Sequence, residues 1–372
     1  MKIAIDVSEA YIQDRTGPGN YVYNFLQAMS RIGSDNEYHL YHHSGCLGSQ
    51  DTMNNSFSMH HVNAPVNRTL WSQVLLPYAM RKEKYDVVHV PGHRMPLHKR
   101  HKTVITIFDL AYIYFRDCFK PMHYARLKYF TERSLSKADR IIAISESTKQ
   151  DIVREYHINP DKINVVYLGV DPTQFPVIVP EVVSDIKKKH SLKDEYIVHV
   201  GTMQPRKNLM RLIAAFDAIK GSSHADLQLV LIGKKGWMYK DIFSLVQELH
   251  LERDVILLDY VDNNTLSGIM RGAKALVYPS LYEGFGLPIL EAFSCGLPVI
   301  ASRSSSLPEI GGDAVIYFDP YNTDEIIHAI SELLEDADKR AEMAQKGRER
   351  VNLFSWEKTA RETIEAYEKV QQ

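Results

Sequence analysis

Cysteine is scarce in this sequence of 372 residues. The three thiols, Cys46, Cys118 and Cys295, are isolated, and none of them belongs to a CxxC pair. Structural zinc sites and disulfide frameworks need cysteines at close or fixed spacings, so neither is indicated. The sequence therefore predicts a reducing compartment and a cytoplasmic protein.

Long apolar runs are also missing. No segment approaches the ~20 consecutive apolar residues that a membrane-spanning helix needs. Residues 1–7 are too short and too alternating for a signal peptide, and they predict a first β-strand instead. Any membrane contact is therefore expected to be peripheral, at the inner face of the cytoplasmic membrane.

The sequence has no strong charge of one sign, since the formal net charge is −2. The halves nevertheless differ: residues 1–172 carry 21 Lys and Arg against 17 Asp and Glu, and the remainder carries 23 against 29. The first half also holds a basic cluster at residues 98–102. Such a surface fits either contact with an anionic membrane or an ordinary solvated loop, and no nucleic-acid partner is expected.

A repeated strand, loop and helix pattern is what the sequence does contain. Short runs rich in Val, Ile and Leu occur in both halves, at residues 87–90, 103–108, 138–147, 164–170, 196–200, 227–233, 255–261, 275–278 and 297–301. Such runs are typical of buried parallel strands, and helical spacing follows many of them. The pattern predicts the α/β class, with two doubly wound domains.

The expected boundary between the two domains is rich in proline. Pro172, Pro176 and Pro180 lie in a stretch with a short charged run, which predicts a linker at residues 173–189. The domains are then residues 1–172 and 190–355. Ser355 is expected to cap a C-terminal amphipathic helix at about residues 356–372.

Residues 278–291 place one carboxylate in a glycine-rich loop and a second one in the helix that follows. Pro288 suits a first helical turn and Gly296 suits the position after the last one, so a helix is expected over residues 287–295. The free amides at its start form an anion site that a phosphate could occupy. Glu283 and Glu291 would repel a phosphate, so the motif calls for a cation nearby.

Arg206 and Lys207 supply such cations. They follow the strand at residues 196–200, and ligands of open α/β sheets bind beyond the carboxyl ends of strands. A guanidinium and an ammonium could hold a diphosphate there, although a bare Arg-Lys pair is often only a solvated surface. Glu291 could then bind a ribose diol and Glu283 the hydroxyls of a sugar. Alternatively, Glu283 caps the helix and Glu291 lies on its exposed face.

The first half has weaker candidates. Gly17 and Gly19 lie in a loop before the helical pattern of residues 21–29, where backbone amides could approach a phosphate or a sugar, unless the loop is a simple tight turn. Asp109 follows the strand at residues 103–108 and is expected at the carboxyl edge of the sheet. Its alternative role is that of a helix or turn cap.

These motifs together resemble the retaining glycosyltransferases of family 4, which have the GT-B fold. The resemblance rests on Glu283, residues 284–288 and Glu291, together with residues 201–208, and residues 16–21, 108–110 and 143–148 also match. It implies two Rossmann-like domains facing across a cleft, with the C-terminal helix crossing back to the first domain. A nucleotide-diphosphate sugar would bind the second domain and an acceptor the first, without a cofactor.

The resemblance also implies residue roles. Arg206 and Lys207 would neutralise the diphosphate, Glu291 would bind the ribose and Glu283 the donor sugar. The predicted catalytic residues are Asp109, Arg206, Lys207 and Glu283, and the predicted donor-binding residues are Gly17, Gly19, Arg206, Lys207, Val261, Glu283, Gly284, Phe285, Gly286, Leu287 and Glu291. The chain departs from many relatives at Phe108, where they carry histidine, so more weight falls on Asp109.

The predicted reaction is transfer of a hexose with retention of configuration. No nucleophile is evident, which favours front-face attack, and no DxD motif lies beside the phosphate site, so a metal is not required. The glycine and Arg-Lys loops resemble those of bacterial polysaccharide mannosyltransferases, which points to GDP-mannose, with a UDP-hexose as second choice, and to a saccharide acceptor that is lipid-linked. Two other readings stay open: a catalytically silent nucleotide-sugar binding protein, which Phe108 favours, and a glycoside hydrolase using Glu283 and Glu291.

Overall fold

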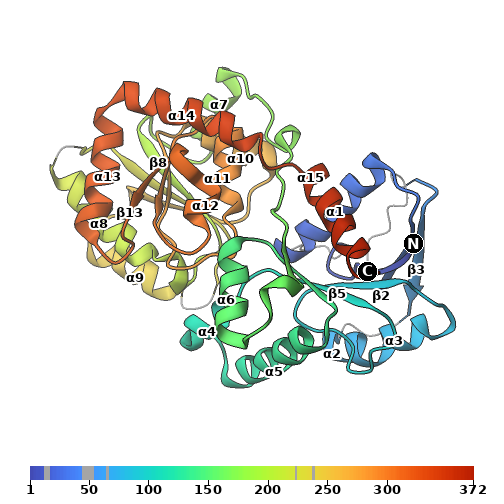
Figure 1. The fold of residues 1–372 in the computed structure, drawn as a ribbon. Helices are drawn as coiled ribbons and strands as arrows, with labels where there is room; N and C mark the ends of the chain where they lie inside the picture. Colours follow the sequence, from blue (N-terminus) through green and yellow to red (C-terminus); the bar gives the residue numbers. More distant parts are fainter. Residues whose placement is uncertain (12–16, 44–53, 64–66, 223, 237–238) are drawn as a thin grey trace. The chain divides into compact units, whose positions relative to one another are not determined.

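The computed structural model describes residues 1–11, 17–43, 54–63, 67–222, 224–236 and 239–372. Cys46, and Thr16 of the stretch 16–21, lie outside these ranges. The chain divides into two compact units, which are described separately (Figure 1). The first comprises Met1–Gly169 with Phe354–Gln372, and the second comprises Val170–Leu353.

A seven-stranded parallel sheet forms the centre of the first unit, in the order β3-β2-β1-β4-β5-β6-β7. The central pair sets the register, with Ala4 of β1 opposite Val88 of β4. The strands are β1 (Lys2–Asp6), β2 (Glu37–His43), β3 (Phe57–Val62), β4 (Val87–Pro91), β5 (Thr103–Ile107), β6 (Arg140–Ala143) and β7 (Ile163–Val165).

Helices cover both faces of this sheet. They are α1 (Gly17–Ile32), α2 (Arg68–Leu70), η1 (Trp71–Leu75), α3 (Leu76–Ala79), η2 (Met80–Lys82), α4 (Ala111–Tyr114), η3 (Arg116–Cys118), α5 (Pro121–Lys137), α6 (Glu146–Tyr156), η4 (Pro160–Lys162) and α15 (Trp356–Glu368). Successive residues of β4 point to opposite faces of the sheet. Val88 and Val90 belong to a core with Leu135 of α5 and Ile152 of α6, whereas His89 between them bonds Tyr367 of α15.

The C-terminal helix α15 belongs to the first unit and lies against α1 (Figure 1). As the sequence predicts, Ser355 caps it: the Ser355 Oγ accepts the Lys358 amide at 3.2 Å. Gly169, where the chain leaves the unit, meets the start of this helix. A Cβ on Gly169 would lie 2.1 Å from the Trp356 nitrogen, so only glycine allows the two backbones to approach this closely.

The second unit has a six-stranded parallel sheet in the order β10-β9-β8-β11-β12-β13. Its strands are β8 (Tyr196–Val200), β9 (Gln228–Ile232), β10 (Val255–Leu258), β11 (Leu276–Tyr278), β12 (Val299–Ser302) and β13 (Val315–Phe318). Its helices are η5 (Pro172–Gln174), α7 (Pro180–Lys189), η6 (Pro205–Lys207), α8 (Leu209–Ser222), α9 (Lys240–Glu248), α10 (Asn263–Gly272), α11 (Leu287–Ser294), α12 (Leu307–Gly311), η7 (Gly312–Ala314), α13 (Thr323–Glu335) and α14 (Ala337–Val351). Helices α8, α9 and α13 cover one face of the sheet, and α10 and α11 cover the other (Figure 1).

Both units are doubly wound α/β domains, so the predicted fold class is confirmed. Several boundaries differ from the prediction. The stretch expected as a linker, residues 173–189, lies in the second unit and contains α7, because Pro180 occupies a first helical turn that tolerates proline. The strand expected over residues 255–261 ends at Leu258, and the one expected over 164–170 is the shorter β7.

In the part of the chain that the structure describes, no helix is both long enough and apolar enough to cross a membrane.

Candidate active site

The two predicted cations lie on a short turn at the carboxyl end of β8. Pro205 fixes the start of this 3-10 turn, and Asn208 ends it in a left-handed conformation with φ of 58°. The Leu281 amide donates to the Arg206 carbonyl at 2.8 Å. This bond ties the cationic turn to the loop that follows β11, which carries Glu283.

Glu283 joins both cations. Its Oε2 accepts from Arg206 Nη1 at 2.8 Å, and its Oε1 accepts from the Lys207 ammonium. The Glu283 and Lys207 residues are only 7% and 5% exposed. Burial alone would raise the pKa of Glu283, but the Arg206 and Lys207 charges outweigh it and hold that pKa well below its usual range. Glu283 is therefore an ionised carboxylate that positions two cations.

Tyr278 completes this cluster. Its hydroxyl accepts from Lys207 Nζ at 2.7 Å and donates to Glu283 Oε1 at 3.0 Å. Its ring stacks on His199 with 5.5 Å between the centroids. Burial and the Lys207 charge lower the pKa of His199 to about 4, so the imidazole is neutral at pH 7. His199 therefore adds no second positive charge beside the Lys207 ammonium.

Two serines stabilise the loop from Glu283 to Gly286 through hydrogen bonds to its backbone. The Glu283 amide donates to Ser305 Oγ at 2.8 Å, and the Ser306 hydroxyl donates to the carbonyls of Glu283 at 3.0 Å and Phe285 at 2.7 Å. These serines were not predicted from the sequence. A run of serines far from the motif carries no periodic or spacing signal that would assign them this role.

Helix α11 begins where this loop ends. Gly286 is its N-cap residue, with φ of 117°, a conformation that residues with a Cβ rarely adopt. Leu287 and Pro288 follow, and the Ile289 amide bonds the Gly286 carbonyl at 3.0 Å. The positive end of the helix dipole thus lies at this loop. The capping role considered for Glu283 is excluded, because its carboxylate contacts cations instead.

Glu291 lies on the first turns of α11 and is half-buried. In the described chain its carboxylate takes part in no hydrogen bond or ion pair, and burial raises its pKa to about 7. Glu291 is therefore not a fully solvated side chain on an exposed face. Val261, also predicted as donor-binding, lies half-buried in the loop between β10 and α10.

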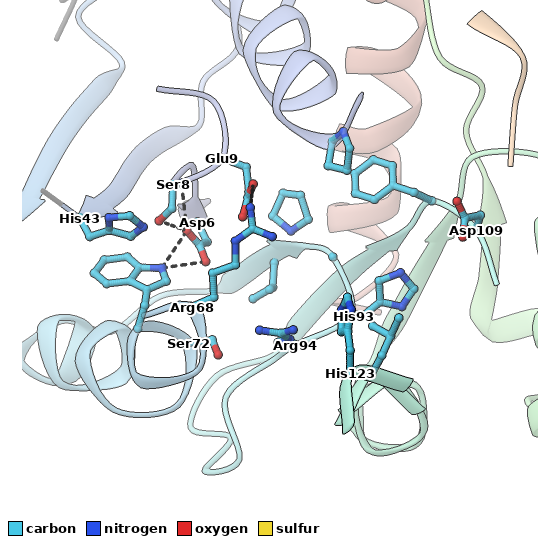
Figure 2. A pocket seen from close by; sticks show the side chains of 17 residues that line it. Asp6, Ser8, Glu9, His43, Arg68, Ser72, His93, Arg94, Asp109 and His123 are labelled. Carbon is cyan, nitrogen blue, oxygen red and sulfur yellow. Dashed lines mark hydrogen bonds and ion pairs between the residues drawn. The ribbon is translucent and has the colours of Figure 1, made fainter. Parts of the chain in front are cut away.

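A cavity of about 280 Å³ opens in the first unit, at the carboxyl ends of β1, β4 and β5 (Figure 2). Charged and polar residues line it: Asp6, Ser8, Glu9, His43, Arg68, Ser72, His93, Arg94, Asp109 and His123. Burial raises the pKa of Asp6, whose carboxylate accepts from the Trp71 indole at 3.0 Å and from the Ser8 hydroxyl at 2.6 Å.

Asp109 lines this cavity and also caps a turn, since its Oδ1 accepts the Ala111 amide at 2.9 Å. Asp109 therefore caps a turn and also lies at the carboxyl edge of the sheet, so the two roles that the sequence allows are compatible. The neighbouring Phe108 lines the cavity as well, and its ring lies edge-on to Tyr21 at 5.2 Å. Gly17 and Gly19 lie in the first turn of α1 rather than in a loop before it, and Pro18 between them reaches the cavity.

The two histidines near β4 differ. His89 is fully buried, bonds Thr106 and Tyr367 at 2.8 and 2.7 Å, and has a pKa lowered to about 3 by burial, so its contacts hold the sheet and α15 together. His93 lines the cavity, and burial lowers its pKa to about 4. Arg68, Arg94 and Glu9 in the cavity were not predicted, although Arg94 follows β4 closely enough for the strand-end rule to have found it.

The structure therefore brings Arg206, Lys207 and Glu283 into direct contact, beside Gly284, Phe285, Gly286 and Leu287, with Glu291 on the following helix of the same unit. Asp109, Gly17 and Gly19 belong to the first unit. Among the described residues, no group of three or more His, Cys, Asp or Glu side chains is arranged as a metal site.

Two family models together match most of the chain. The description "Glycosyltransferase Family 4" matches residues 15–174, and "Glycosyl transferases group 1" matches residues 183–350. The O-antigen chain mannosyltransferase B of Escherichia coli is 32% identical over 293 residues, which are 78% of this chain and 76% of that protein.

The chain belongs to glycosyltransferase family 4.

Solved structures agree on the fold of this glycosyltransferase. A sucrose-phosphate synthase from Thermosynechococcus elongatus superposes with a TM-score of 0.79 at 20% identity, covering 100% of this chain and 99% of the other. The Anabaena protein HepE, solved in complex with UDP-glucose, gives a TM-score of 0.75 at 16% identity, with coverage of 99% and 100%. The two Rossmann-like domains thus form the GT-B fold.

Proposed function

We propose that this family 4 glycosyltransferase moves a hexose from a nucleotide-diphosphate sugar to a saccharide acceptor in the synthesis of a bacterial surface polysaccharide. Mannose from GDP-mannose is the first choice of donor, supported by the name of the Escherichia coli relative. A UDP-hexose is the second choice, supported by the UDP-glucose complex of HepE. The acceptor is proposed to be lipid-linked.

The contact of Arg206 and Lys207 with Glu283, beside the start of α11, is the observation that carries this proposal. In glycosyl transfer the diphosphate gains negative charge as it leaves, and fixed cations and a helix N-terminus stabilise that charge. Because Glu283 neutralises one of the two positive charges, the cluster keeps a net charge of +1 before the donor binds. The Glu291 carboxylate is proposed to accept hydrogen bonds from the ribose diol, which is supported by its position on the helix that follows the cation cluster.

We infer front-face attack with retention of configuration. The acceptor hydroxyl oxygen bonds to the anomeric carbon while the bond from that carbon to the diphosphate breaks, and the hydroxyl proton passes to a diphosphate oxygen. Glu283 is a poor nucleophile for the alternative double displacement, since each of its oxygens is bonded to a cation. The same observation weighs against the glycoside hydrolase reading.

A donor panel tests the proposal. The protein is incubated with GDP-mannose, UDP-glucose, ADP-glucose or dTDP-glucose, with and without saccharide acceptors, and products are analysed by mass spectrometry and proton NMR. We expect one donor to be consumed only when an acceptor is present, with the donor's α configuration kept in the product. Release of free sugar would indicate a hydrolase, and donor binding without product across the panel would indicate a silent binding protein.

A further inference from the structure

Tyr278 ends strand β11 inside the cation cluster and has no role in the mechanism proposed above. It is only 1% exposed, so its hydroxyl meets protein groups rather than solvent. Burial raises the pKa of Tyr278 well above its usual value, so the hydroxyl keeps its proton near neutral pH. A buried tyrosine that stays protonated acts through its hydrogen bonds.

The hydrogen bonds among Tyr278, Lys207 and Glu283 have a single possible direction. The Lys207 ammonium can only donate, and the ionised Glu283 carboxylate can only accept. The Tyr278 hydroxyl therefore accepts from Lys207 Nζ at 2.7 Å and gives its proton to Glu283 Oε1 at 3.0 Å. Lys207 also donates directly to Glu283 Oε1, so the three groups close a triangle.

The ring of Tyr278 is fixed as well. It stacks on His199 with 16° between the ring planes, and His199 Nδ1 bonds the Val277 carbonyl at 3.1 Å. Since a carbonyl only accepts, Nδ1 carries the proton of the neutral imidazole. Lys207 Nζ lies 4.8 Å from the centroid of the Tyr278 ring, whose face attracts a cation. These contacts hold the hydroxyl oxygen at one point beside the ammonium.

We propose that Tyr278 is a positioning residue that orients the Lys207 ammonium toward the leaving diphosphate. A diphosphate competes with Glu283 for Lys207, so the ammonium must turn part of its hydrogen bonding toward phosphate oxygens. The Tyr278 hydroxyl bonds both groups, and it therefore leaves Glu283 with a donor and Lys207 with a fixed acceptor during this exchange. The inference rests on the proposed function, because the anion is taken to be the diphosphate of a nucleotide sugar.

Tyr278→Phe tests this role, since it removes the hydroxyl and keeps the ring. The charges of the cluster do not change, so the KM for the donor should stay within about twofold of wild type. The kcat for transfer should fall about tenfold, because the hydrogen bond that orients the ammonium is lost. Steady-state assays with the donor that wild type uses measure both, and an unchanged kcat would overturn the proposal.

Tyr196→Phe is the matched control. Tyr196 begins β8 of the same unit, is fully buried, and donates its hydroxyl proton to the Ile269 carbonyl at 2.7 Å, outside the cation cluster. Each variant loses one buried hydrogen bond of a tyrosine, but Tyr196→Phe should transfer at the wild-type rate. Equal slowing by the two variants would assign the effect to stability and contradict a positioning role.

A double-mutant cycle with Lys207→Ala measures whether Tyr278 acts through Lys207. Lys207→Ala leaves no ammonium to orient, so the double variant should transfer within about twofold of the rate of Lys207→Ala alone. A further tenfold loss in the double variant would show that the two residues act independently, which contradicts the proposal.

Crystal structures of wild type and Tyr278→Phe without ligand give a readout that needs no reaction. We expect the Lys207 side chain to shift or to become disordered in the variant, and an ordered Lys207 in its wild-type position would overturn the inference. If Lys207 shifts but no donor supports transfer, the positioning role stands and the proposed reaction falls. If Tyr278→Phe transfers as fast as wild type, the proposed reaction stands and the positioning role falls.

Discussion

Glu283 holds the two cations that we assign to the donor diphosphate, so it competes with that diphosphate for them. Replacing Glu283 by Gln removes the competing charge and leaves Arg206 and Lys207 less firmly positioned. We therefore predict that Glu283→Gln binds GDP or UDP at least as tightly as wild type while its turnover falls about a hundredfold. Calorimetry measures the affinity for GDP or UDP, and a steady-state transfer assay measures the turnover.

An exposed acid of the same unit provides the control, because Glu248→Gln in α9 alters a side chain outside the cation cluster by the same charge. Weaker nucleotide binding by Glu283→Gln than by wild type would show that Glu283 supports the diphosphate rather than competes with it.

Glu291 should make donor binding depend on pH. Its pKa is raised to about 7 by burial, and only the ionised carboxylate accepts two hydrogen bonds from a ribose diol. Both phosphates of a nucleotide sugar are esterified and do not titrate in this range. Donor affinity is predicted to increase as pH rises from 6 to 8, and Glu291→Gln should abolish this dependence. The same slope in the variant and in wild type would assign the titration to another group.

The raised pKa of Glu291 also has a consequence for stability. A carboxyl with a folded pKa above its unfolded value costs stability once pH exceeds the unfolded value, and the cost levels off above the folded one, about 7. Without ligand, Glu291→Gln should therefore raise Tm relative to wild type at pH 8, and the difference should shrink toward pH 5. A thermal melt at the two pH values measures it, and a difference that does not change with pH would contradict the assignment.

The sequence predicted Arg206, Lys207 and Glu283 as site residues because strand ends and a helix start locate them in each βα unit. It did not predict that they contact one another, since the pairing depends on how the loops after β8 and β11 meet. Nor did it predict Ser305 and Ser306, whose hydroxyls bond backbone groups of the loop. Tertiary hydrogen bonds of this kind have no local pattern.

At the scale of elements, the stability of the first unit should depend on the close approach of Gly169 to the start of α15. A Cβ at Gly169 would lie 2.1 Å from the Trp356 nitrogen, so Gly169→Ala must displace α15 from its place beside α1. We predict a loss of about 2 kcal/mol or more in the free energy of unfolding. Gly221→Ala is the matched control, because nothing lies within 4 Å of its Cβ. Urea unfolding followed by circular dichroism measures both, and equal stability of the two variants would contradict the prediction.

Most parallel strands were predictable because buried strands read as apolar runs. Strands β2 and β3 were missed: β2 reads Glu37–His43 with three histidines, and β3 alternates polar and apolar residues at the sheet edge. Helix α7 was read as linker because its first residue is Pro180. In both cases the local composition suggests irregular structure, and packing in the unit decides otherwise.

At the scale of the whole molecule, we predict that turnover does not need a divalent metal. In the proposed mechanism, Arg206, Lys207 and the α11 N-terminus supply the positive charge that a metal provides in other transferases. Dialysis against EDTA should leave the transfer rate within about twofold of the untreated enzyme. A loss of activity that Mg²⁺ or Mn²⁺ restores would contradict this prediction.

The transfer rate of Arg206→Ala and Lys207→Ala, with the donor that wild type uses, tests most directly that the cation pair stabilises the leaving diphosphate. Each variant is first shown to be folded by circular dichroism, with Lys207→Arg as a variant that keeps the charge. We predict that both alanine variants turn over about a hundredfold more slowly than wild type or worse. Turnover equal to wild type in both would contradict the account.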